Sequence, residues 1–77
     1  MKITIYGPGC TKCQQTEEIV RRVVSESGST AEVSKVEDFQ QMAAAGVLMT
    51  PAIAVDGVIK LSGRVPKPEE VKQWISG

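Results

Sequence analysis

The sequence predicts an α/β fold in which the elements follow the order strand, helix, strand, helix, strand, strand, helix. Two observations predict this order. A run of alternating β-branched residues changes to a helical period near residue 11, and two later apolar runs are separated by the turn dipeptide Asp56-Gly57. Parallel strands at the start and an antiparallel hairpin at the end would form a four-stranded mixed sheet with helices on both faces.

The first strand is expected at Lys2 to Tyr6, where β-branched and aromatic residues are frequent, and the segment Gly7 to Gly9 breaks it off. The first helix is expected from Thr11 to Ser27, because apolar residues recur there at spacings of three, four and seven. At ~100° per residue these residues fall on one side of the helix. This apolar side comprises Cys13, Thr16, Val20, Val23 and Val24. Cys10 is therefore expected at the N-terminus of an amphipathic helix.

The remaining elements follow from shorter patterns. They are a strand at Thr30 to Val36, a helix opened by Glu37 and Asp38 and stopped by Gly46, strands at Ala52 to Val55 and Val58 to Leu61, and a helix at Glu69 to Ser76. Acidic residues suit the N-terminal end of a helix dipole, and an Asp-Gly dipeptide suits a two-residue turn with positive φ. Gly28 marks the end of the first helix, and Pro68 lies near the first turn of the last one.

Composition narrows the class of protein. A chain of 77 residues is expected to form one domain, spanning residues 1–77, and to be a monomer. Nine Lys and Arg residues balance nine Asp and Glu residues, without the clustered positive charge that nucleic acids and anionic membranes require. No apolar stretch reaches the ~18 residues of a membrane span, and the N-terminus lacks the apolar core of a signal peptide. We therefore expect a cytoplasmic protein with neither a nucleic acid nor a membrane as its partner.

Cys10 and Cys13, the two cysteines of the chain, are the candidate catalytic residues. Unpaired backbone N–H groups and the positive end of the helix dipole favour the thiolate of Cys10, so its pKa should be low. Thiolate is the form that attacks disulfides. Cys13 lies closer to the apolar side of the helix, so we expect Cys10 to attack and Cys13 to resolve the mixed disulfide. The charge of Lys12 would either favour the thiolate further or be solvated at the surface.

The spacing of the pair allows a reversible disulfide. Three residues of separation at a helix start bring the two Cβ atoms close enough for the bond to close with little backbone movement. A bridge that closes so short a loop would restrict the unfolded chain very little, so a purely structural role is not expected. We expect the Cys10-Cys13 disulfide to be the redox group, with no further cofactor and no metal.

The chain resembles the thioredoxin superfamily in its Cys-x-x-Cys motif after the first strand, its Thr-Pro pair opening the third strand, and its terminal helix. Within that superfamily it is similar to the small thioredoxin-like, glutaredoxin-like redox-active disulfide proteins of archaea and bacteria. The segments that carry this resemblance are Gly7-Pro8-Gly9-Cys10-Thr11-Lys12-Cys13, Thr50-Pro51-Ala52, Val55-Asp56-Gly57 and Ser62-Gly63-Arg64-Val65-Pro66.

The resemblance implies a thioredoxin fold and a protein-disulfide oxidoreductase. It implies that the bond between Thr50 and Pro51 is cis, faces the reactive sulfur and lets the backbone pair with an extended substrate segment. Gly9, Thr11 and Lys12 would support the site. The implied partners are disulfide-containing proteins as substrates and a thioredoxin-reductase-like protein as the electron donor.

Two segments differ from the better-known branches of the superfamily. The thioredoxins that the chain resembles carry a buried acid on the first strand that helps to deprotonate the resolving cysteine. Lys2 to Tyr6 contains no carboxylate, so another base, or water, must serve. The segment that holds glutathione in glutaredoxins is not reproduced in Ser62 to Val65.

Two other functions are compatible with a Cys-x-x-Cys motif. Small carrier domains bind soft metal ions through two thiolates in the loop between a first strand and a first helix. Such domains usually have a methionine two residues before the first cysteine, where this chain has Pro8, and their element order differs. Alternatively, an apolar patch around Pro51 docks a partner protein and the cysteines only sense the redox state. Repeated turnover of a disulfide would distinguish an enzyme from such a sensor.

Overall fold

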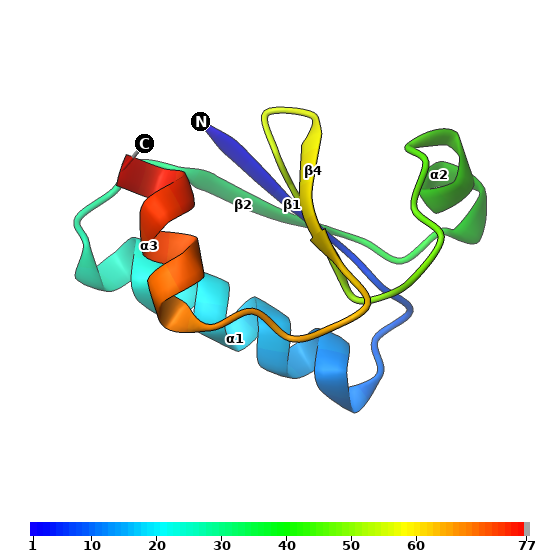
Figure 1. Ribbon diagram of the computed structural model, residues 1–77, viewed down its shortest axis with the longest axis horizontal. Coiled ribbons are helices and arrows are strands. Elements are labelled where there is room, and N and C mark those ends of the chain that lie inside the picture. The colour runs from blue at the N-terminus through cyan, green and yellow to red at the C-terminus, as the bar shows by residue number, and fades with distance from the viewer. Residues whose placement is uncertain (77) are drawn as a thin grey trace.

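The computed structural model describes residues 1–76 and has the predicted order of elements (Figure 1). The elements are β1 (Lys2–Tyr6), α1 (Thr11–Glu26), β2 (Glu32–Val36), α2 (Phe39–Ala44), β3 (Ala52–Val55), β4 (Val58–Ser62) and α3 (Pro68–Ser76). None of the helices in this described part of the chain is long and apolar enough to cross a membrane.

The four strands form one mixed sheet with the order β2-β1-β3-β4. β1 is parallel to β2, and it is antiparallel to β3, which in turn pairs with β4 in the predicted hairpin. The turn of that hairpin has positive φ at both Asp56 and Gly57, as the Asp-Gly dipeptide predicts. The Asp56 side chain also accepts a hydrogen bond of 2.7 Å from the backbone N–H of Lys2.

α1 and α3 cover one face of the sheet, and they lie together below it in Figure 1. Because side chains alternate along a strand, Ile3 and Ile5 of β1 point to the same face as their partners on β3. These strand residues form the main core with residues of the two helices. The buried members of this core are Ile3, Ile5, Ile53, Val55, Val20, Val23 and Val71.

α2 lies against the opposite face, at the end of the sheet where β1 finishes (Figure 1). Met42 of α2, together with Val47 and Ala52, forms a second buried cluster against which Tyr6 and Ile59 pack. Helices therefore lie on both faces, as predicted, but the six-residue α2 covers much less of the sheet than α1 and α3 do. Both clusters meet β1 and β3, the two strands that lead to the cysteine motif and to Pro51.

Several element boundaries differ from the prediction by one or two residues. β2 begins at Glu32 instead of Thr30, because the backbone N–H of Ala31 bonds to the hydroxyl of Ser29 in a local turn. Asp38 lies before α2 as its N-cap, and its carboxylate accepts a hydrogen bond of 2.8 Å from the N–H of Gln40. α1 ends at Glu26, one residue earlier than predicted.

Candidate redox site

Cys10 and Cys13 lie at the start of α1, with their sulfur atoms 2.9 Å apart. Cys10 is the N-cap residue and is exposed, and its carbonyl accepts the first helical hydrogen bond from Gln14. Cys13 belongs to the first turn and is buried, with 4% of its surface exposed. Both thiols are free. The pair is thus one accessible sulfur in hydrogen-bond contact with one inaccessible sulfur.

The surroundings shift the pKa values of the two thiols in opposite directions. The hydrogen bond from the Cys13 side chain is the main cause that lowers the pKa of Cys10. The backbone N–H groups of Cys13 and Lys12 lower the pKa of Cys10 further. The Cys10 side chain nevertheless makes no capping hydrogen bond of full strength to the start of α1. Burial raises the pKa of Cys13, and so does its contact with the Cys10 sulfur. Cys10 is therefore the thiol of the pair that ionises more readily, and its thiolate can accept a hydrogen bond from the Cys13 thiol.

The loop between β1 and α1 places Cys10 at the surface, beyond the end of the sheet. Gly9 has φ +89°, a conformation that favours glycine, and its carbonyl accepts a hydrogen bond from the Gln14 side chain at 3.2 Å. Thr11 and Lys12 begin α1 and are exposed. All three expected supporting residues lie within two positions of Cys10 in the chain: Gly9 has the positive φ of the turn, and the backbone N–H of Lys12 lowers the pKa of Cys10.

The register of the sheet brings Thr50 and Pro51 to the cysteine loop. Tyr6, the last residue of β1, pairs with Ala52, the first of β3, so the next position on each strand places Pro51 beside Gly7. The bond between Thr50 and Pro51 is cis, as the resemblance implied. Pro51 is buried, Thr50 is half-buried, and the Pro51 carbonyl accepts a hydrogen bond from Gly63 at 2.9 Å.

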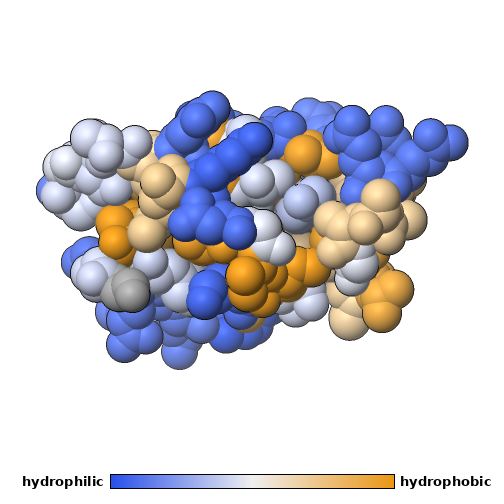
Figure 2. All heavy atoms as spheres, turned by 90° about the horizontal axis from the view of Figure 1, so that it is seen from above, coloured by the Kyte–Doolittle hydropathy of each residue, from blue (hydrophilic) through white to orange (hydrophobic). Residues whose placement is uncertain are grey.

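Apolar side chains are exposed on the chain that approaches Thr50. Leu48 is 95% exposed and Met49 is 62% exposed, and Phe39 of α2 is 71% exposed. Figure 2 shows apolar surface at the end of the molecule that carries α2, on the right in both views. The Met49 side chain packs against Gly63. A Cβ added to Gly63 would lie 3.3 Å from the Met49 Cε. Leu48 and Met49 form an apolar rim directly before the Thr50-Pro51 segment.

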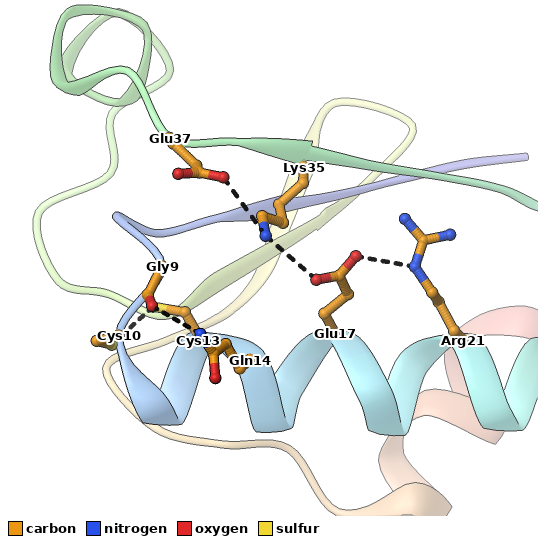
Figure 3. Close-up of polar contacts among 8 residues, drawn as sticks. All are labelled: Gly9, Cys10, Cys13, Gln14, Glu17, Arg21, Lys35 and Glu37. Atoms are coloured by element: carbon orange, nitrogen blue, oxygen red, sulfur yellow. Dashed lines mark hydrogen bonds and ion pairs between the residues drawn. The ribbon is translucent and has the colours of Figure 1, made fainter.

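A row of alternating charges runs from α1 to the cysteine loop (Figure 3). Arg21 contacts Glu17 at 2.9 Å, Glu17 contacts Lys35 at 3.3 Å, and Lys35 contacts Glu37 at 3.4 Å. Arg21 and then Lys35 lower the pKa of Glu17, and the pKa of Lys35 is raised by Glu17 and then Glu37. Glu37 ends this row beside Gly9, where an added Cβ would lie 3.6 Å from its Oε2. Within this row, the Glu17–Lys35 pair joins α1 to β2.

The metal-carrier alternative would use the same two sulfurs. Within residues 1–76, no group of three or more His, Cys, Asp and Glu side chains is arranged to hold a metal ion. The cysteines alone would supply two soft ligands at the exposed start of α1.

The sequence pattern did not single out two contacts of the site. One is the contact of Cys13 with Gly7, and the other is that of Met49 with Gly63. The glycines at both positions were visible in the sequence, but their packing partners were not. The pattern also led us to expect the helix dipole and N–H groups as the cause of the low Cys10 pKa, whereas the Cys13 thiol is the largest cause.

An accessible sulfur and a buried sulfur in contact, at the first turn after the first strand of this sheet, define the class of thiol–disulfide oxidoreductases with a thioredoxin fold. Comparison with known proteins agrees. The thioredoxin domain family matches residues 1–76, and the chain therefore belongs to the thioredoxin family.

Two archaeal relatives support the same assignment. The chain is 45% identical over 76 residues to a thioredoxin of Methanothermobacter thermautotrophicus, and the match covers 99% of both chains. It is also 45% identical over 71 residues to a thioredoxin of Methanocaldococcus jannaschii, covering 92% of this chain and 81% of the relative. The expected membership of the thioredoxin superfamily, among proteins of archaea or bacteria, is confirmed, and both of these relatives are archaeal.

Proposed function

We propose that this chain transfers electrons to disulfide bonds in other proteins through Cys10 and Cys13. The observation that carries the proposal is the 2.9 Å contact between two sulfurs whose pKa values are shifted in opposite directions. In such a pair the accessible thiol loses its proton more readily and can act as the nucleophile, and the buried thiol keeps its proton to higher pH. Cys10 is the attacking residue and Cys13 the resolving residue.

In the first step the Cys10 thiolate attacks one sulfur of the substrate disulfide. A mixed disulfide forms between Cys10 and the substrate, and the other substrate sulfur leaves as a thiolate that takes a proton from solvent. This step consumes the negative charge of Cys10. Cys10 then no longer raises the pKa of Cys13 through their hydrogen bond and its charge. Burial remains as the main cause that keeps the pKa of Cys13 high.

In the second step Cys13 loses its proton to water and attacks the Cys10 sulfur. The Cys10-Cys13 disulfide forms, and the second substrate sulfur leaves and is protonated. Two electrons have passed from the dithiol to the substrate disulfide. A thioredoxin-reductase-like donor then returns two electrons to the Cys10-Cys13 disulfide, which is the redox group, without a further cofactor. A cytoplasmic location suits this cycle because thiols are kept reduced there.

The substrate chain docks beside the sulfurs. Thr50 and Pro51 lie next to the loop that carries Cys10, where an extended segment could form main-chain hydrogen bonds with the backbone at Thr50. The apolar rim would take apolar side chains of such a segment, because Leu48 and Met49 offer uncovered apolar surface at the adjoining positions.

The test is covalent trapping of a disulfide-containing protein such as insulin. Cys13→Ser should accumulate a mixed disulfide on Cys10, because the resolving thiol is missing, and a non-reducing gel with peptide mass analysis should detect it. Cys10→Ser is the matched control and should form no adduct. An adduct on Cys13 of the Cys10→Ser control, together with no adduct on Cys10 of Cys13→Ser, would reverse the two roles.

Equilibration of the wild-type protein against glutathione and dithiothreitol buffers tests the cycle itself. Alkylation of free thiols followed by mass measurement should reveal one reversible intramolecular disulfide. Failure to form it at any redox poise would reject the proposed function. Zinc or copper(I) titration followed by native mass spectrometry would then test the metal-carrier alternative.

A further inference from the structure

We propose that Gly7 is a positioning residue for the resolving sulfur. Because Gly7 has no side chain, the Cys13 sulfur can occupy the space that a Cβ on residue 7 would fill. This inference rests on the proposed function, because it concerns how Cys13 reaches Cys10. A Cβ built on Gly7 would lie 2.3 Å from Cys13 Sγ and 3.0 Å from Cys13 Cβ. Real Cβ atoms do not approach a sulfur so closely, so one of the two groups would have to move.

Gly7 is needed for space and not for backbone conformation. The described glycines with positive φ are Gly9, Gly28, Gly46, Gly57 and Gly63. Gly7 is not among them, so its backbone is open to residues with side chains. The contact with Cys13 is what distinguishes Gly7 from the other glycines within residues 1–76, whose added Cβ atoms would meet nothing closer than 3.3 Å.

The backbone on both sides of this contact is held in place. Gly7 is buried, and its N–H donates a 3.0 Å hydrogen bond to the carbonyl of Val36, which ties it to the end of β2. Cys13 lies in the first turn of α1, and Thr16 at the next turn is fully buried. Since neither backbone can withdraw easily, the side chain of Cys13 is the part that would yield to a methyl group on residue 7.

A methyl group at residue 7 should therefore affect the disulfide more than the dithiol. In the dithiol the Cys13 sulfur can rotate about χ1 to another staggered position, away from the new methyl group. In the disulfide the bond to Cys10 holds the same sulfur near Gly7, so the clash cannot be relieved by rotation. The absence of a side chain at Gly7 thus favours the oxidised form and lets the resolving sulfur stay within reach of Cys10.

The test is the redox equilibrium of Gly7→Ala. Measured against glutathione, the equilibrium should shift at least tenfold toward the dithiol, which corresponds to about 30 mV for a two-electron couple. The mixed disulfide with a substrate should also persist longer, because Cys13 attacks from a worse position. A folded Gly7→Ala protein whose equilibrium constant stays within twofold of the wild-type value would overturn the inference.

Two controls separate positioning from general stability. Gly28→Ala places a methyl group where nothing lies within 4 Å of it, at a residue with φ +68°. It should lower the melting temperature and leave the redox equilibrium unchanged. If Gly28→Ala moved the equilibrium as far as Gly7→Ala does, the effect would be one of global stability and the inference would fail.

A Cys13→Ala background identifies the atom involved. That background lacks the sulfur that a Cβ on residue 7 would meet, so adding Gly7→Ala should lower the melting temperature much less than it does in the wild type. This comparison also decides the case in which Gly7→Ala does not fold by itself: recovery of folding in the double variant supports the inference, and equal loss overturns it. A wild-type protein without a reversible disulfide would instead reject the proposed function.

Discussion

Two thiols three residues apart differ here because one is in water and the other is against the sheet. Cys10 caps α1 at the surface, while Cys13 packs on Gly7 with 4% of its surface exposed. Burial disfavours a charged sulfur, so Cys10 ionises more readily than Cys13, and the Cys13 thiol and the first N–H groups of α1 can stabilise its thiolate.

The pH dependence of Cys10 alkylation should report this arrangement. Iodoacetamide reacts with the thiolate, so the rate should rise with pH and level off once the pH exceeds the lowered pKa of Cys10. Cys13→Ala removes the main cause of that lowering, so its profile should be displaced to higher pH. Mass analysis of the modified peptide would assign the reaction to Cys10.

Cys13→Ser is the matched control for this measurement. Its hydroxyl can still donate a hydrogen bond to the Cys10 sulfur, so its profile should be displaced less than that of Cys13→Ala. Superimposable profiles for the wild type and both variants would show that the Cys13 side chain does not set the reactivity of Cys10.

At the scale of elements, α3 is tied to the segment that precedes it by one carboxylate. Glu70 accepts two hydrogen bonds from the Arg64 guanidinium, at 2.9 Å and 2.7 Å, and one from the backbone N–H of Lys67 at 2.9 Å. Arg64 and then the Lys67 N–H lower the pKa of Glu70 from 4.5 to about 2. Arg64, in the segment that followed the predicted hairpin, therefore has a partner within the protein.

The stability of the protein should depend on Glu70 in a defined pH range. A carboxylate whose pKa is lowered on folding stabilises the folded state above its unfolded pKa of 4.5, and this contribution is lost as the pH falls through about 2. Glu70→Gln should therefore lower the melting temperature at pH 6, and the difference from the wild type should shrink steadily as the pH approaches 2.

Glu69→Gln provides the comparison for Glu70→Gln, because Glu69 is an exposed acid in the same first turn of α3. It should change the melting temperature less at pH 6. A difference between wild type and Glu70→Gln that stayed constant from pH 6 to pH 2 would contradict the role given to the ionised carboxylate.

Sequence patterns predicted the elements better than their ends. The helical period from residue 11 and the Asp56-Gly57 turn are local features, and both are confirmed. The start of β2 was wrong by two residues, because Thr30 and Ala31 continue the apolar and β-branched pattern while the Ser29 hydroxyl bonds locally to Ala31. Hydrogen bonds of this kind compete with a strand without changing its residue pattern.

At the scale of the whole molecule, one face of the sheet carries most of the core. Ile53 lies at its centre, fully buried on β3 between Ile5 of β1 and Leu61 of β4. The other face has only the small cluster around Met42. The positions of α1, and hence of the cysteines, depend on the first of these two clusters.

Ile53→Ala should lower the free energy of unfolding by about 2–5 kcal/mol, because it removes buried apolar surface and leaves a cavity. Urea denaturation followed by circular dichroism would measure the loss. Val58→Ala, at a position that is 57% exposed on the neighbouring strand, should change the free energy of unfolding by less than about 0.5 kcal/mol. Equal effects of the two substitutions would contradict this placement of the core.

The sequence by itself determined the order of the elements, the mixed sheet and the position of a cysteine pair at the start of a helix. These features depend on residues close together along the chain, whose periodicity and turn chemistry act locally. The resemblance of its motifs also identified Thr50 and Pro51, which the register then brought beside the cysteine loop.

Only the tertiary structure decided what the two sulfurs contact and what holds them in place. The burial of Cys13 depends on the close approach of α1 to the end of β1. Its contact with Gly7 depends on the hydrogen bond between Gly7 and Val36 of β2. Met49 reaches Gly63 for a similar reason, through the pairing of β3 with β4. Contacts of this kind join residues distant along the chain, and their distances are set by packing, which residue patterns do not contain.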